Sequence, residues 1–186
     1  MIDYNLLNKS ILYYENKGFK RIEAPWTVSK AIDDITRPKD RIPFELKHNN
    51  KRLVASGEQS FLYLYLKNFL PSGCYQAITP CWRFESFDFL HTKYFMKNEL
   101  IKTDKVNEDE LWKIVNQAVD FFQPLFKSKL EIINTGTPVN TSYDIEIEGK
   151  ELGSYGIREC EFLKWIYGTA LAEPRTSSLI KLYGIS

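Results

Sequence analysis

The sequence predicts an α+β domain with a mainly antiparallel sheet, and three features of the chain support this fold class. Segments with the 3.6-residue period of amphipathic helices stand near both ends of the chain and in its middle. Between them lie two pairs of extended segments, each joined by a short connection that suits an antiparallel hairpin. The chain has 186 residues and is 44% hydrophobic, so we expect a single domain with a buried core over residues 1–186.

The N-terminal segment predicts a helix followed by a strand. Over residues 4–17, apolar residues recur three or four apart, and Gly18 follows where helices commonly end. Residues 19–24 then alternate as in a strand, until Pro25 ends the run because proline cannot donate to a central sheet ladder. Helix, strand and proline therefore form one unit.

The next segments predict an irregular stretch, a short strand and a helix. Residues 29–50 are polar and contain two prolines and an Asn-Asn pair, which favours irregular structure with a turn at its end. A strand is expected at residues 52–55. The segment SFLYLYLKNFL, residues 60–70, then has the length and spacing of a helix.

The remaining elements come in the order strands, helix, strands, helix. Residues 75–85 and 91–101 are extended and separated by a short loop, which predicts an antiparallel hairpin. A capping box followed by one apolar face predicts a helix over residues 107–125. Alternating residues at 143–147 and a glycine turn predict a second hairpin. Pro174 marks the first turn of a final helix, where its missing N–H costs least.

The composition excludes several classes of protein. Lysine and arginine total 25 against 24 acidic residues, so the formal charge of +1 provides no general field for a polyanion. No apolar run approaches the roughly 20 residues of a membrane span, and the N-terminus lacks the pattern of a signal peptide. We therefore expect a cytoplasmic protein with no membrane partner. The cysteines, Cys74, Cys81 and Cys160, form no C-x-x-C pair and are expected to be reduced and buried.

The first predicted hairpin carries a set of polar and aromatic side chains at odd positions. The set comprises Arg83, Glu85, Phe95 and Glu99. Residues two or four apart in a strand share a face, so one face would present a guanidinium, an aromatic ring and two carboxylates. These groups suit a phosphate, a stacked base and the polar edge of that base. Alone, Arg83 and Glu85 would be an exposed ion pair worth under about 1 kcal/mol, but the wider spacing favours a nucleotide site.

This hairpin and its flanks resemble a known family. From Arg83 to Glu99, the spacing R-x-E-x-x-D-x-x-H-x-x-x-F-x-x-x-E resembles the second motif of class II aminoacyl-tRNA synthetases, in the form of the phenylalanyl and pyrrolysyl enzymes. Upstream, GFKRIEAP resembles the first motif, which ends in a proline, here Pro25. Downstream, YGTALAEPRTSSLI resembles the third motif in its seryl-enzyme form, with the motif's arginine at Arg175.

The chain departs from the family pattern in two respects. Of the glycines usual in the third motif only Gly168 remains, and Ala170 and Pro174 stand where glycine is common, which would restrict a close approach of ATP to the backbone. The three motifs also occupy nearly the whole chain, so we expect a stand-alone catalytic core without an anticodon-binding domain.

The resemblance implies the class II catalytic core, with ATP and an amino acid or similar carboxylic acid joined as an acyl adenylate. Arg83 and Arg175 would be the catalytic cations that bind the phosphates. The other positions that it implies for the nucleotide are Glu85, His91, Phe95, Glu151 and Ser154. His91 stands where a basic residue contacts the γ-phosphate, although by itself it would be interpreted equally well as a solvated loop residue.

The resemblance also implies a magnesium ion and a site for the acid. Glu151, in ELGS, resembles the acid that holds Mg²⁺ on the ATP phosphates, and oxygen ligands suit this metal. Glu58, in SGEQ, resembles the acidic residue that some of these enzymes use for the substrate ammonium, and Arg83 and Glu99 complete the predicted acid-binding set. Without the resemblance, Glu58 would be a charge favourable to the dipole of its helix and Glu151 an ordinary strand residue.

The family's interface motif further implies a homodimer through residues 4–25. The acceptor of the acyl group stays open among a carrier protein, a small molecule, a protein side chain and a tRNA held by another subunit. Two other functions are compatible with the sequence: a catalytically silent paralogue that binds a ligand or partner, and a structural dimerisation module. The arginines and the aromatic residue retained in the motifs favour the ligase.

Overall fold

The computed structural model describes residues 1–84, 90, 92–138 and 140–185, and a seven-stranded sheet forms its centre. The strands of this sheet are β1 (Lys20–Arg21), β4 (Cys74–Trp82), β5 (Tyr94–Lys102), β6 (Glu131–Asn134), β7 (Ser142–Ile147), β8 (Lys150–Cys160) and β9 (Leu163–Glu173). Their order across the sheet is β1-β4-β5-β9-β8-β7-β6. All neighbours pair antiparallel except β1 and β4, which are parallel. The predicted α+β class is confirmed.

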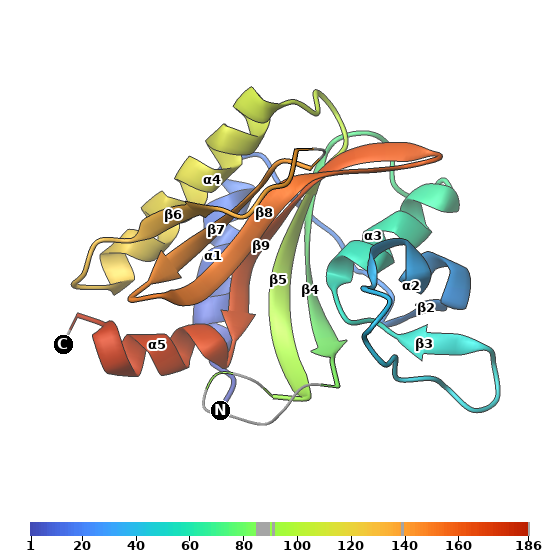
Figure 1. The fold of residues 1–186 in the computed structure, drawn as a ribbon, viewed down its shortest axis with the longest axis horizontal. Coiled ribbons are helices and arrows are strands. Elements are labelled where there is room, and N and C mark those ends of the chain that lie inside the picture. Colours follow the sequence, from blue (N-terminus) through green and yellow to red (C-terminus); the bar gives the residue numbers. More distant parts are fainter. Residues whose placement is uncertain (85–89, 91, 139, 186) are drawn as a thin grey trace.

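Helices and a small second sheet complete the fold (Figure 1). The helices are α1 (Tyr4–Glu15), α2 (Lys30–Thr36), α3 (Gly57–Leu66), α4 (Glu108–Phe122) and α5 (Arg175–Tyr183), with a short 3-10 helix at Gln123–Leu125 after α4. The second sheet pairs β2 (Thr27–Ser29) with β3 (Lys51–Leu53) in antiparallel orientation. Within the described residues, none of the helices has the length and apolar character that crossing a membrane requires.

The two faces of the main sheet have different neighbours. The alternation along β5 shows the division, since Met96 and Leu100 belong to the apolar cluster that includes α1 and α4. Ile101 belongs instead to a second cluster, with side chains of α2 and α3. Odd-numbered residues of β5 therefore face away from α1 and α4, and this second face of the sheet bears a polar cleft.

Two irregularities interrupt the regular alternation of the sheet. On β8 the register with β7 skips Leu152, and on β9 the register with β5 skips Ala170. A skipped residue of this kind is a β-bulge, which changes the face that the following side chains occupy. As a result Glu151 and Ser154, three residues apart, both reach the polar cleft, although strict alternation would place them on opposite faces.

Most of the predicted elements are present. α1 occupies the predicted N-terminal helix, and Gly18 follows with φ +92°, a conformation that favours glycine. Both predicted hairpins form, as β4 with β5 and as β7 with β8. α4 begins at the predicted cap, where the side chain of Asn107 accepts a hydrogen bond from the backbone N–H of Glu110 at 2.9 Å.

Two predictions for the first third of the chain were wrong. Residues 29–50 are not irregular throughout, because they contain α2, whose single buried turn packs Ile32 into the second apolar cluster and pairs the buried Asp33 with Arg37. Seven residues are too few for a helical period to be recognised in the sequence. The strand expected over 19–24 forms sheet pairs only at Lys20–Arg21, at the edge of the sheet beside β4.

Replacing Asn107 with alanine should weaken α4 without changing the fold. The substitution removes the acceptor for an N–H in the first turn of the helix, a loss that costs about 1 kcal/mol of stability. Urea unfolding of Asn107→Ala should show this decrease. Asn116→Ala, an exposed change within the same helix, is the control and should cost less, because alanine is the better helix former. Equal losses in the two variants would contradict the capping role.

Candidate functional site

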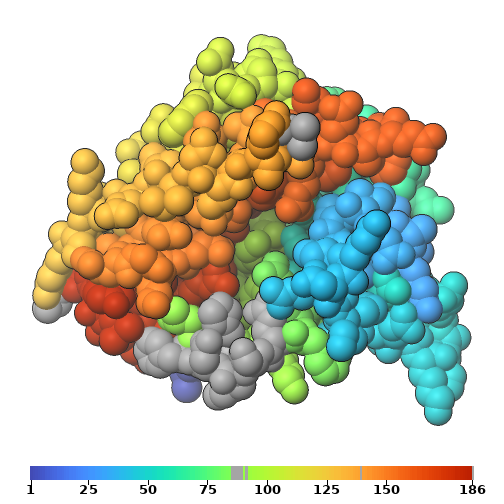
Figure 2. All heavy atoms as spheres, in the orientation of Figure 1, coloured from blue at the N-terminus to red at the C-terminus, as the bar shows by residue number. Residues whose placement is uncertain are grey.

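A cleft of about 320 Å³ lies on the face of the sheet opposite α1 and α4. Its floor comes from β5, β8 and β9, one wall from the start of α3 and residues 36–42, and the other wall from the junction of β9 with α5. In Figure 2 it is hollowed between the blue segment at 36–42 and the orange and red segments of β8, β9 and α5. The cleft is therefore built from segments far apart in the sequence.

The cleft collects every predicted site residue that the structure describes. These are Glu58, Arg83, Phe95, Glu99, Glu151, Ser154 and Arg175. They come from α3, the β4–β5 hairpin, β8 and α5, so four separate parts of the chain meet at one site. Glu85 and His91, which were predicted to contact the nucleotide, lie outside the described residues.

Arg83 and Phe95 form one end of the site. Arg83 follows β4 directly, its Nε donates to the carbonyl of Ala55 at 3.1 Å, and its backbone N–H donates to the carbonyl of Lys93 at 3.1 Å. The guanidinium carbon lies 5.2 Å from the centroid of the Phe95 ring, within the range of a cation–π contact. A planar donor and an aromatic face thus stand side by side, as the alternation along the hairpin predicted.

Arg175 and Glu151 stand at the opposite wall and contact each other. The Nη1 atom of Arg175 donates to Oε1 of Glu151 at 2.7 Å, which joins the first residue of α5 to β8. The Glu151 side chain is 43% exposed, so water and ions have access to this carboxylate. The two residues predicted for the phosphates and for magnesium are therefore neighbours, and they pair with each other.

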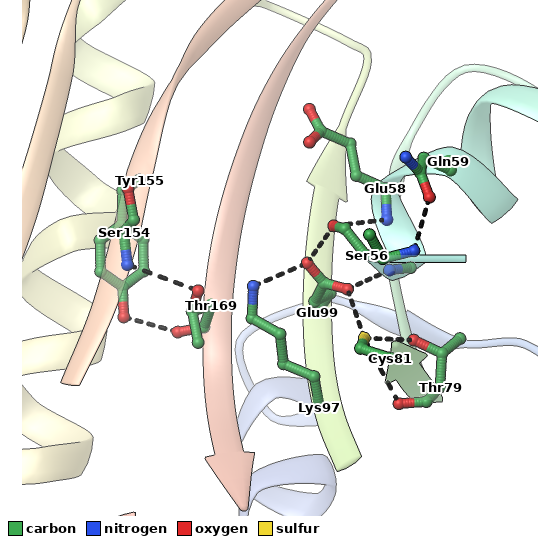
Figure 3. A network of polar contacts seen from close by, with 12 residues as sticks. Ser56, Glu58, Gln59, Thr79, Cys81, Lys97, Glu99, Ser154, Tyr155 and Thr169 are labelled. Carbon is green, nitrogen blue, oxygen red and sulfur yellow. Dashed lines mark hydrogen bonds and ion pairs between the residues drawn. The ribbon is translucent and has the colours of Figure 1, made fainter. Parts of the chain in front are cut away.

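Glu99 is a buried carboxylate on β5, in the floor of the cleft and beside the start of α3 (Figure 3). Its Oε1 accepts from Ser56 Oγ at 2.6 Å and from Lys97 Nζ at 2.8 Å, and its Oε2 accepts from the backbone N–H of Gly57. Burial by itself would raise the pKa of Glu99, but Lys97, Ser56 and Gly57 together outweigh that effect and hold the pKa below its ordinary value. The carboxylate is therefore ionised and fully engaged.

Glu58 is the second buried carboxylate, and its carboxyl group extends away from that of Glu99 (Figure 3). Its Oε1 accepts from the indole N–H of Trp165 at 2.6 Å, and its Oε2 forms an ion pair with Arg158. Burial raises the pKa of Glu58, an effect that Arg158 and Trp165 offset only in part. The guanidinium carbon of Arg158 lies 4.2 Å from the centroid of the Tyr167 ring, so the cation is held on two sides.

The structure adds site residues that the sequence did not reveal. Lys97, Arg158, Tyr167 and Thr169 line the same cleft. Lys97 stands two residues before Glu99 on the same strand, so the period of two could have identified it. Arg158 contacts Glu58 although the two are 100 residues apart in the sequence, and no local sequence pattern predicts that contact.

The donor set in the cleft suits a phosphorylated ligand and a magnesium ion bound through it. No group of three or more His, Cys, Asp or Glu side chains that could hold a metal occurs in the described part of the chain. Magnesium, however, commonly binds one protein carboxylate together with the phosphates of its substrate, and the accessible Glu151 suits this arrangement. Burial raises the pKa of Cys81 to about 12, so this thiol beside Glu99 is neutral and unsuited as a nucleophile or metal ligand.

Comparison with known proteins identifies the fold. No family model matches the sequence, and none of the curated proteins matches it. The structure is similar to seryl-tRNA synthetase from Pyrococcus horikoshii complexed with ATP, with a TM-score of 0.75 and 17% identity over 96% of this chain and 49% of that chain. It is also similar to the cytoplasmic serine-tRNA ligase of Naegleria fowleri in complex with AMP, with a TM-score of 0.72 and 18% identity over 93% of this chain and 52% of that chain.

A third similar structure is pyrrolysyl-tRNA synthetase from Desulfitobacterium hafniense, with a TM-score of 0.74 and 16% identity over 97% of this chain and 70% of that chain. The chain thus spans about half of the length of the two seryl enzymes. It has the fold of class II synthetase catalytic cores, as the three motifs predicted. At these identities the likeness shows the fold alone, because one fold serves many functions.

The buried Glu99 should make the stability of the protein depend on pH. Its pKa lies below the ordinary value of 4.5, so its contribution to stability is present above about pH 4.5 and is lost as the pH falls through the folded-state pKa. Urea titrations at about pH 7 and pH 3.5 give the free energy of unfolding at each pH. Between these two pH values, this free energy should decrease more for wild type than for Glu99→Gln. Glu131→Gln, exposed on β6, should lose as much as wild type. A Glu99→Gln variant with the wild-type loss would contradict this role of the buried carboxylate.

Proposed function

We propose that this chain uses ATP to activate an amino acid or similar carboxylic acid as an acyl adenylate. The observation that supports the proposal is the cleft itself, which gathers Arg83 and Phe95 from the β4–β5 hairpin and Arg175 from α5, and adds an accessible carboxylate, Glu151. Two of the similar structures are complexes with ATP or AMP. By this proposal ATP lies between Phe95 and Arg175, and the acid occupies the end of the cleft near Glu58 and Glu99.

The reaction requires no nucleophile from the protein. A carboxylate oxygen of the acid attacks the α-phosphorus of ATP, a new P–O bond forms, and the bond to the pyrophosphate leaving group breaks. Arg83 stands between the two anions, where a guanidinium with fixed donors holds both and offsets their repulsion. Arg175 would contribute positive charge at the phosphates as negative charge moves to the leaving group.

For Arg175 to bind the phosphates, its contact with Glu151 has to be exchanged for the ligand. The contact is partly exposed to solvent, with Glu151 43% accessible, and exposed ion pairs contribute little to stability. Glu151 and Ser154 would hold the magnesium ion together with the phosphates, and the metal would neutralise part of their charge. The proposal includes transfer of the acyl group to an acceptor, such as a carrier protein, a small molecule, a protein side chain or a tRNA.

Removal of Arg83 should slow adenylation strongly. Loss of one charge-assisted donor in the transition state typically lowers the rate on the order of a hundred- to a thousandfold. We expect that decrease for Arg83→Ala in ATP–pyrophosphate exchange, assayed with a panel of the twenty amino acids and related acids. Arg83→Lys should also fail, because a point charge cannot replace the planar fork.

The control for this experiment is Lys164→Ala, an exposed change on β9 away from the cleft. It should exchange at the wild-type rate. Arg52 is a poor control, since it contacts Asp33, Asp34 and Glu45, and its removal would disturb the wall of the cleft. Exchange by Arg83→Ala at the wild-type rate would remove Arg83 from the mechanism, whereas absence of exchange by wild type with every acid would overturn the proposed function.

We also propose that residues 4–25 form the interface of a homodimer. Tyr4 and Leu12 of α1 are 63% and 52% exposed, and Trp26 immediately after the segment is 58% exposed. Large exposed apolar and aromatic side chains of this kind are typical of interfaces. Light scattering at tens of micromolar should give twice the mass of the chain, and Trp26→Lys should lower it. A monomer at that concentration would refute the dimer and leave the active-site proposal standing.

A further inference from the structure

The acid end of the cleft contains two negative charges, and both are already compensated. Glu58 is paired with Arg158, and Glu99 is paired with Lys97. The side chains of the two glutamates are each 6% exposed. Neutral donors also contact both carboxylates, since Trp165 donates to Glu58 and the N-terminus of α3 donates to Glu99. The pocket that would receive the acid therefore carries no net negative charge from these four groups.

The other carboxylates of the cleft are also engaged. Glu151 accepts from Arg175 at 2.7 Å, at the end proposed for ATP. Glu173 accepts from the backbone N–H of Asp3 at 3.0 Å and from the backbone and hydroxyl of Ser177 at 3.0 and 2.7 Å. Among the described residues that line the cleft, every carboxylate thus has a donor from the protein.

This charge balance disfavours a substrate with an ammonium group next to its reacting carboxylate. An ammonium that enters such a pocket leaves water, and a carboxylate that already has a countercharge offsets this loss of hydration less than a carboxylate without one. In this cleft the attraction of each glutamate is opposed by a lysine or arginine at the same site, and like charges in close contact select against a ligand. A substrate with a neutral group beside its carboxylate is not repelled by these cations.

On this basis, and resting on the proposed adenylation, we propose that the acid activated by this chain lacks a free α-ammonium group. It is a 2-hydroxy or N-acylated acid. Arg158 is the specificity-determining residue, because it holds the charge of Glu58 that would otherwise attract an ammonium. Its position over the Tyr167 ring, 4.2 Å from the centroid, keeps the guanidinium in place, and its side chain lines the cleft and is 39% exposed.

Arg158 is a better target for this test than Lys97. The Lys97 side chain is 14% exposed and belongs to the buried network that joins β5 to α3, so its loss would disturb the fold. Arg158 is more accessible and lies on the β8–β9 hairpin opposite Trp165. Replacing it with glutamine removes the charge and leaves a shorter polar side chain, so Glu58 keeps its hydrogen bond from Trp165 and loses its countercharge.

The experiment compares matched acids in ATP–pyrophosphate exchange. Each amino acid of the panel is assayed beside the 2-hydroxy acid and the N-acetyl amino acid with the same side chain. For wild type we expect a kcat/KM at least about tenfold higher for a member without the ammonium than for the amino acid. For Arg158→Gln, the ratio of kcat/KM for the acid without the ammonium to kcat/KM for the amino acid should fall by about tenfold or more. The change should come mainly from a lower KM for the amino acid. Arg158→Lys keeps the charge and should keep the wild-type preference.

Lys164→Gln, an exposed change on the same hairpin, is the matched control and should leave the ratio unchanged. A wild-type preference for amino acids would overturn this inference and leave the proposed function intact. Exchange with no acid at all would overturn the proposed function, and the inference with it. An Arg158→Gln variant that is folded in thermal denaturation and keeps the wild-type ratio would remove Arg158 as the determinant. If that variant does not fold, the preference of wild type decides.

Discussion

The burial of Glu99 is the constraint on which the arrangement of the cleft depends. A carboxylate inside a protein is tolerated only when donors and a countercharge surround it. Lys97 supplies the charge from the same strand, while Ser56 and Gly57 supply donors from the start of α3. A Cβ on Gly57 would lie 2.9 Å from Glu99 Oε2 and 2.8 Å from Thr79 Oγ1, so only glycine lets the helix approach this closely. The network thereby fixes how closely the start of α3 approaches the sheet at one wall of the cleft.

One face of the sheet packs into the core against α1 and α4, and the other face bears the cleft. The two bulges change locally which residues lie on which face. Leu152 and Ala170 stay in the core against α1 and α4, although each is the extra residue of its pair of strands. Because each bulge shifts the alternation by one, Glu151 and Ser154 share the cleft on β8. Thr169 and Ala172 do the same on β9. In a regular sheet, one residue of the Glu151–Ser154 pair and one of the Thr169–Ala172 pair would face the core.

The sequence predicted those parts of the site that depend on local periodicity. The alternation in the first hairpin predicted Arg83, Glu85, Phe95 and Glu99 on one face, and the three of these that the structure describes, Arg83, Phe95 and Glu99, line one cleft. Alternation alone could not place Glu151 beside Ser154, because a bulge has no signal in a single sequence. The contact of Glu58 with Arg158 was also invisible, since it joins α3 to β8 through the tertiary fold. α2 was missed for a related reason, as its single buried turn is held by packing and ion pairs rather than by its own period.

The ion pairs at the two ends of the cleft differ in burial, and the difference suits two tasks. At the proposed ATP end, Arg175 and Glu151 have side chains 18% and 43% exposed, so water compensates both charges when they separate and the cost is small. At the proposed acid end, Glu58 and Glu99 are each 6% exposed, and separating either from its cation would leave a buried charge without a countercharge. The first end is thus suited to exchanging its partners when a charged ligand binds. The second end is suited to keeping its pairs, and under the proposed function its neutralised charge would disfavour a ligand with an ammonium group.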